Sequence, residues 1–146
     1  MKKVLIVCTG NSCRSQMAEG WIREFAKDKV EVYSAGTHPE PVNAVAIKVM
    51  QSLCVDISQH QSNQIDEYLN LDLDYVITVC DSAKELCPTF PSASKVIHKS
   101  FPDPAKVKGS KNEVVLTYVK VRDMLKEFCK DFVQNELGIS VNDDIR

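Results

Sequence analysis

The sequence lacks long apolar runs, internal repeats and a strong excess of one charge, and these shortages exclude several classes of protein. The apolar run at residues 4–7 is too short for the core of a signal peptide and ends at a Gly-Asn turn, so we expect a cytoplasmic protein that contacts no membrane. A formal net charge of −2 gives no general attraction to nucleic acid or anionic lipid. Any anion must therefore be bound by local geometry.

Histidine is also scarce. The three histidines, His38, His60 and His98, lack the spacing of metal ligands. We expect them on the surface or in loops, and we expect neither a metal nor a cofactor.

The length indicates a single domain. A chain of 146 residues buries roughly 68–70% of the surface that its unfolded form exposes, which is enough to fold without a disulfide or a metal. With 44% hydrophobic and 26% charged residues, the composition is that of an ordinary globular protein. We place the domain at residues 1–137, expect a frayed polar tail at 138–146, and expect a monomer.

Short apolar runs alternate with segments of helical periodicity. Strands are predicted at residues 3–7, 30–34, 75–79 and 95–98, and helices at 17–26, 42–53 and about 113–137. This alternation predicts an α/β fold with three layers (α/β/α) around a central parallel sheet of four strands.

Six cysteines would form three disulfides in a secreted protein, but here they cluster in short motifs. In the cytoplasm this favours reduced thiols with a redox or nucleophilic role. Cys8 and Cys80 each follow a predicted strand, and the carboxyl ends of parallel strands meet at one edge of a sheet. We therefore expect these two thiols to lie close together, and we expect Cys54 and Cys129 to pack in the core.

The segment between the first strand and the first helix is typical of an anion-binding loop. Gly10 and Asn11 tolerate positive φ, which lets successive backbone N–H groups converge on a tetrahedral anion. Arg14 adds a planar fork of donors that matches two oxygens of such an anion. The predicted substrate-binding residues are Thr9, Gly10, Asn11, Ser12, Cys13 and Arg14.

Cys8 is the candidate nucleophile of this loop. A nearby helix N-terminus and Arg14 would lower its pKa, so we expect Cys8 to be mostly ionised. Ser15 can donate a hydrogen bond to the sulfur, and it is also a residue type typical of a helix N-cap. Cys13 is interpreted either as a packing residue at the base of the helix or as a reserve thiol that pairs with Cys8 on oxidation.

Asp103 is the candidate proton donor. It lies between Pro102 and Pro104, whose rings restrict the local backbone. A carboxylic acid held over the anion could protonate the oxygen that leaves when a thiolate attacks. An Asp before a proline is also common in ordinary turns, so this role is a hypothesis.

Residues 8–21, CTGNSCRSQMAEGW, resemble the signature of thioredoxin-coupled arsenate reductases, which share the low-molecular-weight tyrosine phosphatase fold. Further landmarks resemble the family in the same order, so the similarity extends from residue 3 to about residue 128. The insert at 106–112 and the last nine residues have no obvious counterpart. The landmarks are Val32-Tyr33-Ser34-Ala35-Gly36, Asp56-Ile57-Ser58, Val79-Cys80, Cys87-Pro88 and Asp103-Pro104-Ala105.

The resemblance implies that Cys8 is the nucleophile, Arg14 the oxyanion ligand and Asp103 the proton donor. It further implies that Cys80 forms a disulfide with Cys8 and that Cys87 then attacks Cys80, which frees Cys8 and leaves a disulfide between Cys80 and Cys87. Thioredoxin would reduce this final bond. Two alternatives stay open: a phosphatase whose extra cysteines only protect or regulate Cys8, and a redox-sensing oxyanion-binding module without turnover.

Some members of this family hold a potassium ion behind the anion loop. Asn11, Glu19 and Ser34 match that pattern, whereas Asn63 stands where an acidic ligand is expected. For this reason we expect no metal.

Overall fold

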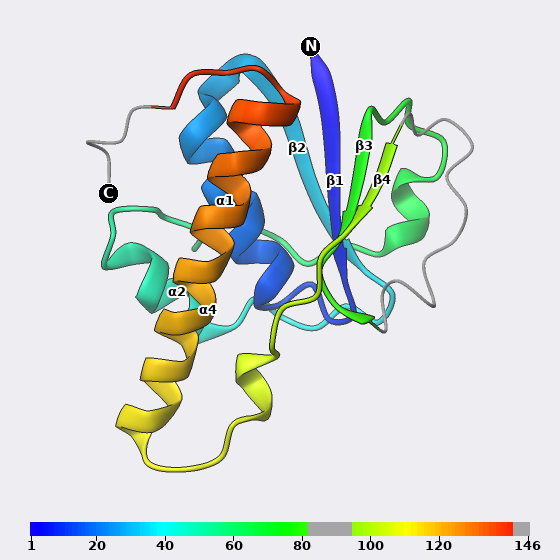
Figure 1. The fold of residues 1–146 in the computed structure, drawn as a ribbon. Coiled ribbons are helices and arrows are strands. Elements are labelled where there is room, and N and C mark those ends of the chain that lie inside the picture. Colours follow the sequence, from blue (N-terminus) through cyan, green and yellow to red (C-terminus); the bar gives the residue numbers. More distant parts are fainter. Residues whose placement is uncertain (82–94, 142–146) are drawn as a thin grey trace.

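A computed structural model describes residues 1–81 and 95–141. Its described strands form one parallel sheet in the order β2-β1-β3-β4 (Figure 1). The strands are β1 (Lys2–Cys8), β2 (Val30–Gly36), β3 (Tyr75–Thr78) and β4 (Lys95–His98). The predicted parallel sheet of four strands is confirmed, with each predicted strand in place.

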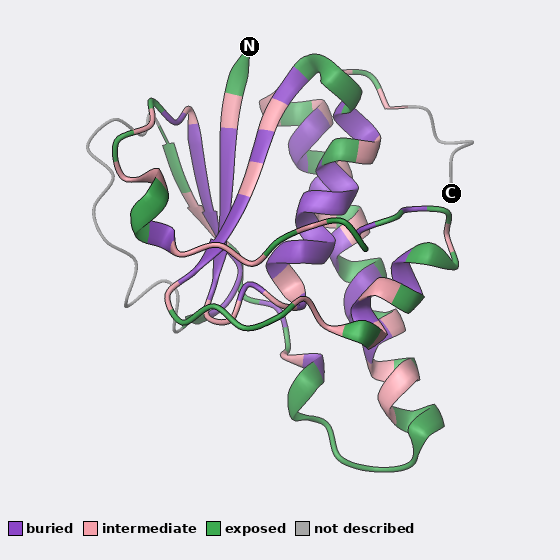
Figure 2. Cartoon of the chain, turned by 180° about the vertical axis from the view of Figure 1, so that it is seen from behind, coloured by how far each residue is buried: buried purple, intermediate pink, exposed green. Residues whose placement is uncertain are grey.

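The central strands are apolar because the sheet is covered on both faces. Residues 4–8 of β1 and all of β3 are buried, as the uninterrupted apolar runs predicted. Strand β4 lies at the edge, and Val96 in it is exposed. Figure 2 shows the buried residues gathered along the central strands and along the first helix.

Three helices lie together on one side of the sheet. They are α1 (Arg14–Ala26), α2 (Ala44–Gln51) and α4 (Lys111–Asp131), which continues into a π-helical turn, Phe132–Glu136. Figure 1 shows a short helical turn, Ile65–Tyr68, on the other side of the sheet. Two further turns are Lys27–Lys29 and Pro104–Lys106.

Close packing of α1 depends on a glycine. A Cβ atom added at Gly20 would lie 2.7 Å from Cγ2 of Ile57 and 3.2 Å from Cε of Met50. The absent side chain therefore lets α1 approach the segment that follows α2. On α4, the carbonyl of Arg122 accepts a hydrogen bond from the buried indole of Trp21 at 3.1 Å.

The helix boundaries differ from the prediction in two instructive places. Ser15 is not the N-cap of α1, because that helix already begins at Arg14, after Cys13. Helix α4 begins before the predicted residue 113, because Ser110 and Glu113 form a capping box.

The two cysteines expected in the core have different environments. Cys129 is fully buried, as predicted, and its thiol donates to the carbonyl of Ala18. Cys54 is exposed, so the prediction for this residue is wrong. It occupies a left-handed turn with φ 63° directly after α2, and its amide donates to Gln51.

The beginning of the predicted tail is described as well. Ile139 and Val141 pack against the core, and the amide of Ile139 donates to the carbonyl of Val133. None of the described helices has the length and apolarity needed to cross a membrane.

Candidate active site

The ends of β1 and β3 bring the two predicted thiols to one edge of the sheet. Cys8 is the last residue of β1, and Val7 pairs with Thr78 at the end of β3. The amide of Val79 donates to Val7, which carries the chain on to Cys80. Because of this register, the hydroxyl of Thr9 lies 3.4 Å from the sulfur of Cys80.

The loop after β1 wraps around the sulfur of Cys8. Asn11 has φ 49°, in the left-handed region, as its residue type predicted. This turn lets the amide of Asn11 donate to Cys8 Sγ over 3.2 Å. The loop thus begins as a cradle of backbone donors around the candidate nucleophile.

Ser15 completes the cradle from the first turn of α1. Its hydroxyl lies 2.8 Å from Cys8 Sγ and accepts a hydrogen bond from Nδ2 of Asn11, also over 2.8 Å. Either group can donate in this contact, but when Cys8 is a thiolate the single proton of the hydroxyl must point at the sulfur. Ser15 is thus placed to donate to the Cys8 thiolate, as the sequence analysis expected.

The pKa of Cys8 does not follow the prediction. The residue is 2% exposed, and its burial raises the pKa of the thiol above the ordinary value. Hydrogen bonds from Ser15 and Asn11 and the charge of Arg14 lower the pKa, but burial is the larger effect. The expectation of a mostly ionised Cys8 is therefore wrong. Burial at the end of the strand destabilises the thiolate more than the hydrogen bonds of the loop and the charge of Arg14 stabilise it.

Arg14 and Asp103 lie beside each other over the loop. Nη1 of Arg14 donates to the carbonyl of Phe101 over 3.0 Å, and Nη2 lies 3.5 Å from Oδ2 of Asp103. The other oxygen of Asp103 accepts from the amide of Ala105 and so caps the helical turn at residues 104–106. This cap fixes the carboxyl group in the way that the flanking prolines suggested.

Two pockets open at this edge of the sheet and share Thr9, Arg14 and Asp103. The first has a volume of about 150 Å³ and contains Cys8 at the loop; the second has about 380 Å³ and contains Cys80. The first is lined by Cys8, Thr9, Gly10, Ser12, Cys13, Arg14, His38, Glu40, Asp103 and Ala105. The structure thus brings the candidate residues Cys8, Arg14, Asp103 and Cys80 to adjoining pockets.

Cys13 lies in the wall of the first pocket, beside α4. Its sulfur is 3.7 Å from the hydroxyl of Tyr118, and burial raises the pKa of its thiol. Both interpretations of Cys13 remain compatible with this position. Cys87, the third predicted thiol of the relay, lies outside the described residues.

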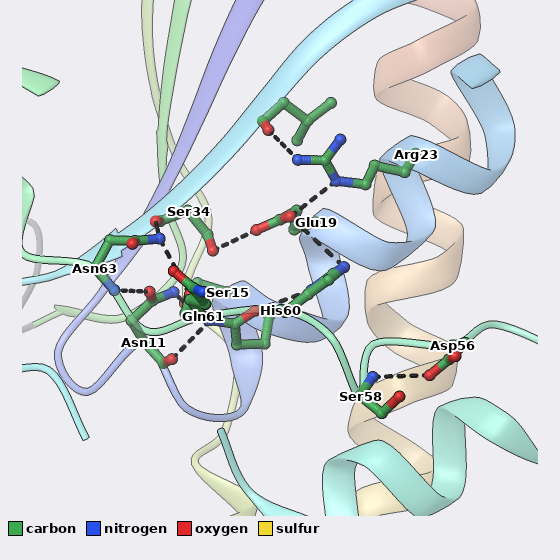
Figure 3. Close-up of polar contacts among 12 residues, drawn as sticks. Asn11, Ser15, Glu19, Arg23, Ser34, Asp56, Ser58, His60, Gln61 and Asn63 are labelled. Atoms are coloured by element: carbon green, nitrogen blue, oxygen red, sulfur yellow. Dashed lines mark hydrogen bonds and ion pairs between the residues drawn. The ribbon is translucent and has the colours of Figure 1, made fainter. Parts of the chain in front are cut away.

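The side chains of Gln16 and Ser62, which the sequence analysis did not single out, and the backbone amide of Asn63 hold the loop from behind. Figure 3 shows Asn63 beside Asn11. The carbonyl of Asn11 accepts from Gln16 over 3.0 Å and from Ser62 over 2.7 Å, and its side-chain oxygen accepts from the amide of Asn63 over 2.8 Å. Gly36 also matters here, since a Cβ atom on it would lie 2.5 Å from the carbonyl of Thr9. The small residue at the end of β2 was the signal in the sequence for this close approach. Asn63 entered the sequence analysis only as a departure from the potassium pattern.

The polar groups behind the loop are bonded to one another and do not fit a metal. Glu19 accepts from Ser34 over 2.6 Å and from Nε of Arg23 over 2.8 Å, so its charge is already compensated. The amide nitrogen of Asn63 donates to the carbonyl of Ser34, where a cation would need a free oxygen. No group of acidic, His or Cys side chains in residues 1–81 and 95–141 could hold a metal ion.

His60 belongs to the same network, although it lies in a loop. Its side chain is 13% exposed, its Nδ1 lies 3.0 Å from Oε1 of Gln16, and its Nε2 lies 3.6 Å from Glu19. Burial lowers the pKa of His60, outweighing the opposite effect of Glu19. Gln16 therefore links His60 to the anion loop.

Comparison with known proteins agrees with this geometry. Residues 3–142 match the low molecular weight phosphotyrosine protein phosphatase family. The chain belongs to this family. Within it, the chain is 41% identical to a curated arsenate reductase of Halalkalibacterium halodurans over 133 residues, 91% of this chain and 96% of the relative. It is 39% identical to an arsenate reductase of Bacillus subtilis with the same coverage.

Solved structures of arsenate reductases superpose on most of this chain. An arsenate reductase in the phosphate-binding state superposes with a TM-score of 0.75 and 31% identity, covering 96% of this chain and 100% of that one. An arsenate reductase in the oxidised state superposes with a TM-score of 0.77 and 30% identity, covering 91% and 97%. The phosphatase-like fold that the loop motif predicted is thereby confirmed.

Proposed function

We propose that the protein is a cytoplasmic, monomeric arsenate reductase that thioredoxin regenerates. The observation that carries this proposal is the position of Cys80, whose sulfur lies 3.4 Å from the hydroxyl of Thr9 in the loop around Cys8. A phosphatase needs only one thiol, whereas a reductase needs a second one within reach of the first. The curated relatives named arsenate reductase support the same assignment.

The first step is attack of the deprotonated sulfur of Cys8 on arsenate. A bond forms between sulfur and arsenic, and one arsenate oxygen leaves as water after Asp103 donates a proton to it. Arg14 and the backbone N–H groups of residues 9–14 bind the remaining oxygens. The raised pKa of Cys8 means that Ser15, Asn11 and Arg14 act when the thiolate forms, by stabilising its charge.

The second step reduces arsenic. The thiolate of Cys80 attacks the sulfur of Cys8, a disulfide forms, and the sulfur–arsenic bond breaks with its electron pair left on arsenic. Arsenic thereby passes from the +5 to the +3 state and leaves as arsenite. Two electrons have come from two thiols, which are now joined.

The third step returns Cys8 to its starting state. Cys87 attacks Cys80, which frees Cys8 and leaves a disulfide between Cys80 and Cys87. A dithiol of thioredoxin then reduces this bond by the same exchange reaction. The proposal assigns this role to Cys87 from the resemblance of its motif.

The test is arsenate-dependent consumption of NADPH in the presence of thioredoxin and thioredoxin reductase, run beside glutaredoxin with glutathione. We expect turnover only in the first mixture. A Cys87→Ser variant should release about one arsenite per protein and then stop, while Cys54→Ser, an exposed cysteine outside both pockets, should turn over normally. Multiple turnover by Cys87→Ser would contradict the relay.

A phosphatase is the second candidate, because Cys8, Arg14 and Asp103 suffice for hydrolysis of a phosphate monoester. It predicts fast hydrolysis of p-nitrophenyl phosphate that persists in the double variant Cys80→Ser/Cys87→Ser. It also predicts no arsenite release in the thioredoxin assay.

A further inference from the structure

The rim of the first pocket is a strap of residues 37–43 that runs along the anion loop. The amide of His38 donates to Thr9 and that of Glu40 donates to Gly10, each over 2.8 Å. At the far end, the amide of Asn43 donates to Ser12 over 2.9 Å. The strap is thus held to the loop by three backbone hydrogen bonds. These bonds fix the position of its backbone, and so the points from which its side chains extend, relative to the anion site.

Glu40 is the charged residue at the centre of this strap. It lies between Pro39 and Pro41, whose rings restrict the backbone on both sides. Its carboxylate reaches back over the loop, because a Cβ atom built on Gly10 would lie 3.7 Å from Oε2 of Glu40. Glu40 and Asp103 therefore both line the pocket that contains Cys8.

The two carboxylates differ in their partners. Asp103 is paired with Arg14, whereas no cation forms an ion pair with Glu40 among residues 1–81 and 95–141. The strap leaves Glu40 exposed to solvent at the rim. The pocket entrance thus carries a negative charge that no ion pair with another described residue compensates.

The described lining of the pocket offers little aromatic surface. It contains no Phe, Tyr or Trp around its volume of about 150 Å³, and the one ring among the described lining residues is the imidazole of His38. A bare tetrahedral anion fits below the rim and experiences the charge of Glu40 only at a distance. The organic group of a phosphate monoester must instead cross the rim, where it would remove water from the carboxylate and would meet no Phe, Tyr or Trp of the described lining.

We propose that Glu40 is a specificity-determining residue that restricts the site to small, free oxyanions and suppresses the hydrolysis of aryl phosphates. This proposal deepens the arsenate reductase function and rests on it. Glu40 acts through charge at the entrance, and it neither attacks nor protonates the substrate.

The experiment compares Glu40→Gln with Glu127→Gln, which removes one exposed carboxylate from α4 that lines neither pocket. Binding of inorganic phosphate to the reduced protein is measured by calorimetry. A unit charge at roughly 8 Å from a dianion in water predicts that Glu40→Gln tightens phosphate binding about fivefold, while Glu127→Gln leaves it unchanged. This difference should shrink toward onefold at about 1 M salt, which a purely structural effect of the side chain would not do.

The same variants are then assayed for thioredoxin-dependent arsenate reduction and for hydrolysis of p-nitrophenyl phosphate. We expect Glu40→Gln to lower KM for arsenate with little change in kcat, and to raise kcat/KM for the aryl phosphate about tenfold. Unchanged phosphate affinity, or an unchanged ratio of the two activities, would overturn the proposal. If the wild-type protein reduces no arsenate at all, the proposed function fails, while calorimetry and the phosphatase assay still decide the role of Glu40.

Discussion

The anion loop has two faces, and they are built from different groups. Its pocket face is formed by the loop residues that line the first pocket, among them Cys8, Cys13 and Arg14. Its rear face is bonded by the side chains of Gln16 and Ser62 and by the backbone amide of Asn63. Asn11 faces the rear, since it lines neither of the two pockets beside the loop.

The two faces of the loop therefore have different roles, one in the reaction and one in holding the shape of the loop. Groups on the pocket face would touch the substrate, so their loss should reduce the rate at saturating substrate. Groups on the rear face keep the loop in its shape, so their loss should reduce stability as well as rate. Substitutions of the same type on the two faces therefore test whether the faces have these different roles.

Arg14→Lys should have the largest effect. Lysine keeps the charge but loses the planar fork that bonds Phe101 and lies beside Asp103. We expect kcat/KM for arsenate to fall about 100-fold or more, as for loss of an oxyanion donor. The matched change behind the loop is Arg23→Lys, which should stay within about threefold. Equal losses in steady-state assays of the two variants would remove the distinction between the faces.

Asn11→Ala tests the rear face. The substitution removes the hydrogen bonds to Ser15 and from Asn63, and alanine disfavours the left-handed φ of 49°. We expect kcat/KM to fall about 30-fold and the melting temperature to fall by about 5 °C. Both quantities come from steady-state kinetics and thermal unfolding of the purified variant.

Asn11→Gly is the control, because glycine accepts the backbone conformation without restoring the side chain. It should recover about 1 kcal/mol of unfolding free energy relative to alanine, while its activity stays low. An Asn11→Gly variant with wild-type activity would show that only the backbone conformation matters.

The sequence predicted the parts of the site that depend on local pattern and strand direction. Apolar runs that end at Cys8 and just before Cys80 placed both thiols at one edge of a parallel sheet, and the structure joins them through Thr9. Gly10 and Asn11 indicated a tight loop by residue type alone, and Asn11 has the positive φ expected of it.

The parts that the sequence did not predict depend on tertiary surroundings. The raised pKa of Cys8 follows from complete burial, which a motif does not reveal. His60 is held by Gln16, 44 positions earlier in the chain, so its burial has no local signal. Cys54 was expected in the core, but it is exposed. At a turn the direction of the backbone decides whether a side chain is buried, and the residue type alone does not reveal that direction.

Ser15→Ala should have a smaller effect, confined to the nucleophile. Its hydroxyl lowers the pKa of Cys8, so removal raises that pKa further and reduces the thiolate fraction at neutral pH. Loss of one hydrogen bond to a charged group predicts that alkylation of Cys8 by iodoacetamide at pH 7 slows about tenfold. The rate is followed by mass spectrometry of the peptide that contains Cys8. Ser12→Ala, whose hydroxyl bonds Cys13 instead, should react like the wild type.

The smallest expected effect is a change in how stability depends on pH. Burial lowers the pKa of His60 in the folded protein, so the unfolded chain binds more protons between that value and its own, near 6.5. Stability should therefore decrease as pH falls through this window, and His60→Gln should remove that part of the dependence, under about 1 kcal/mol. Urea unfolding at pH 5 and at pH 8 measures it for both proteins. A wild-type protein with a steeper loss than His60→Gln fits a neutral histidine supporting Gln16 behind the loop, whereas parallel curves would mean that folding does not lower the pKa of His60.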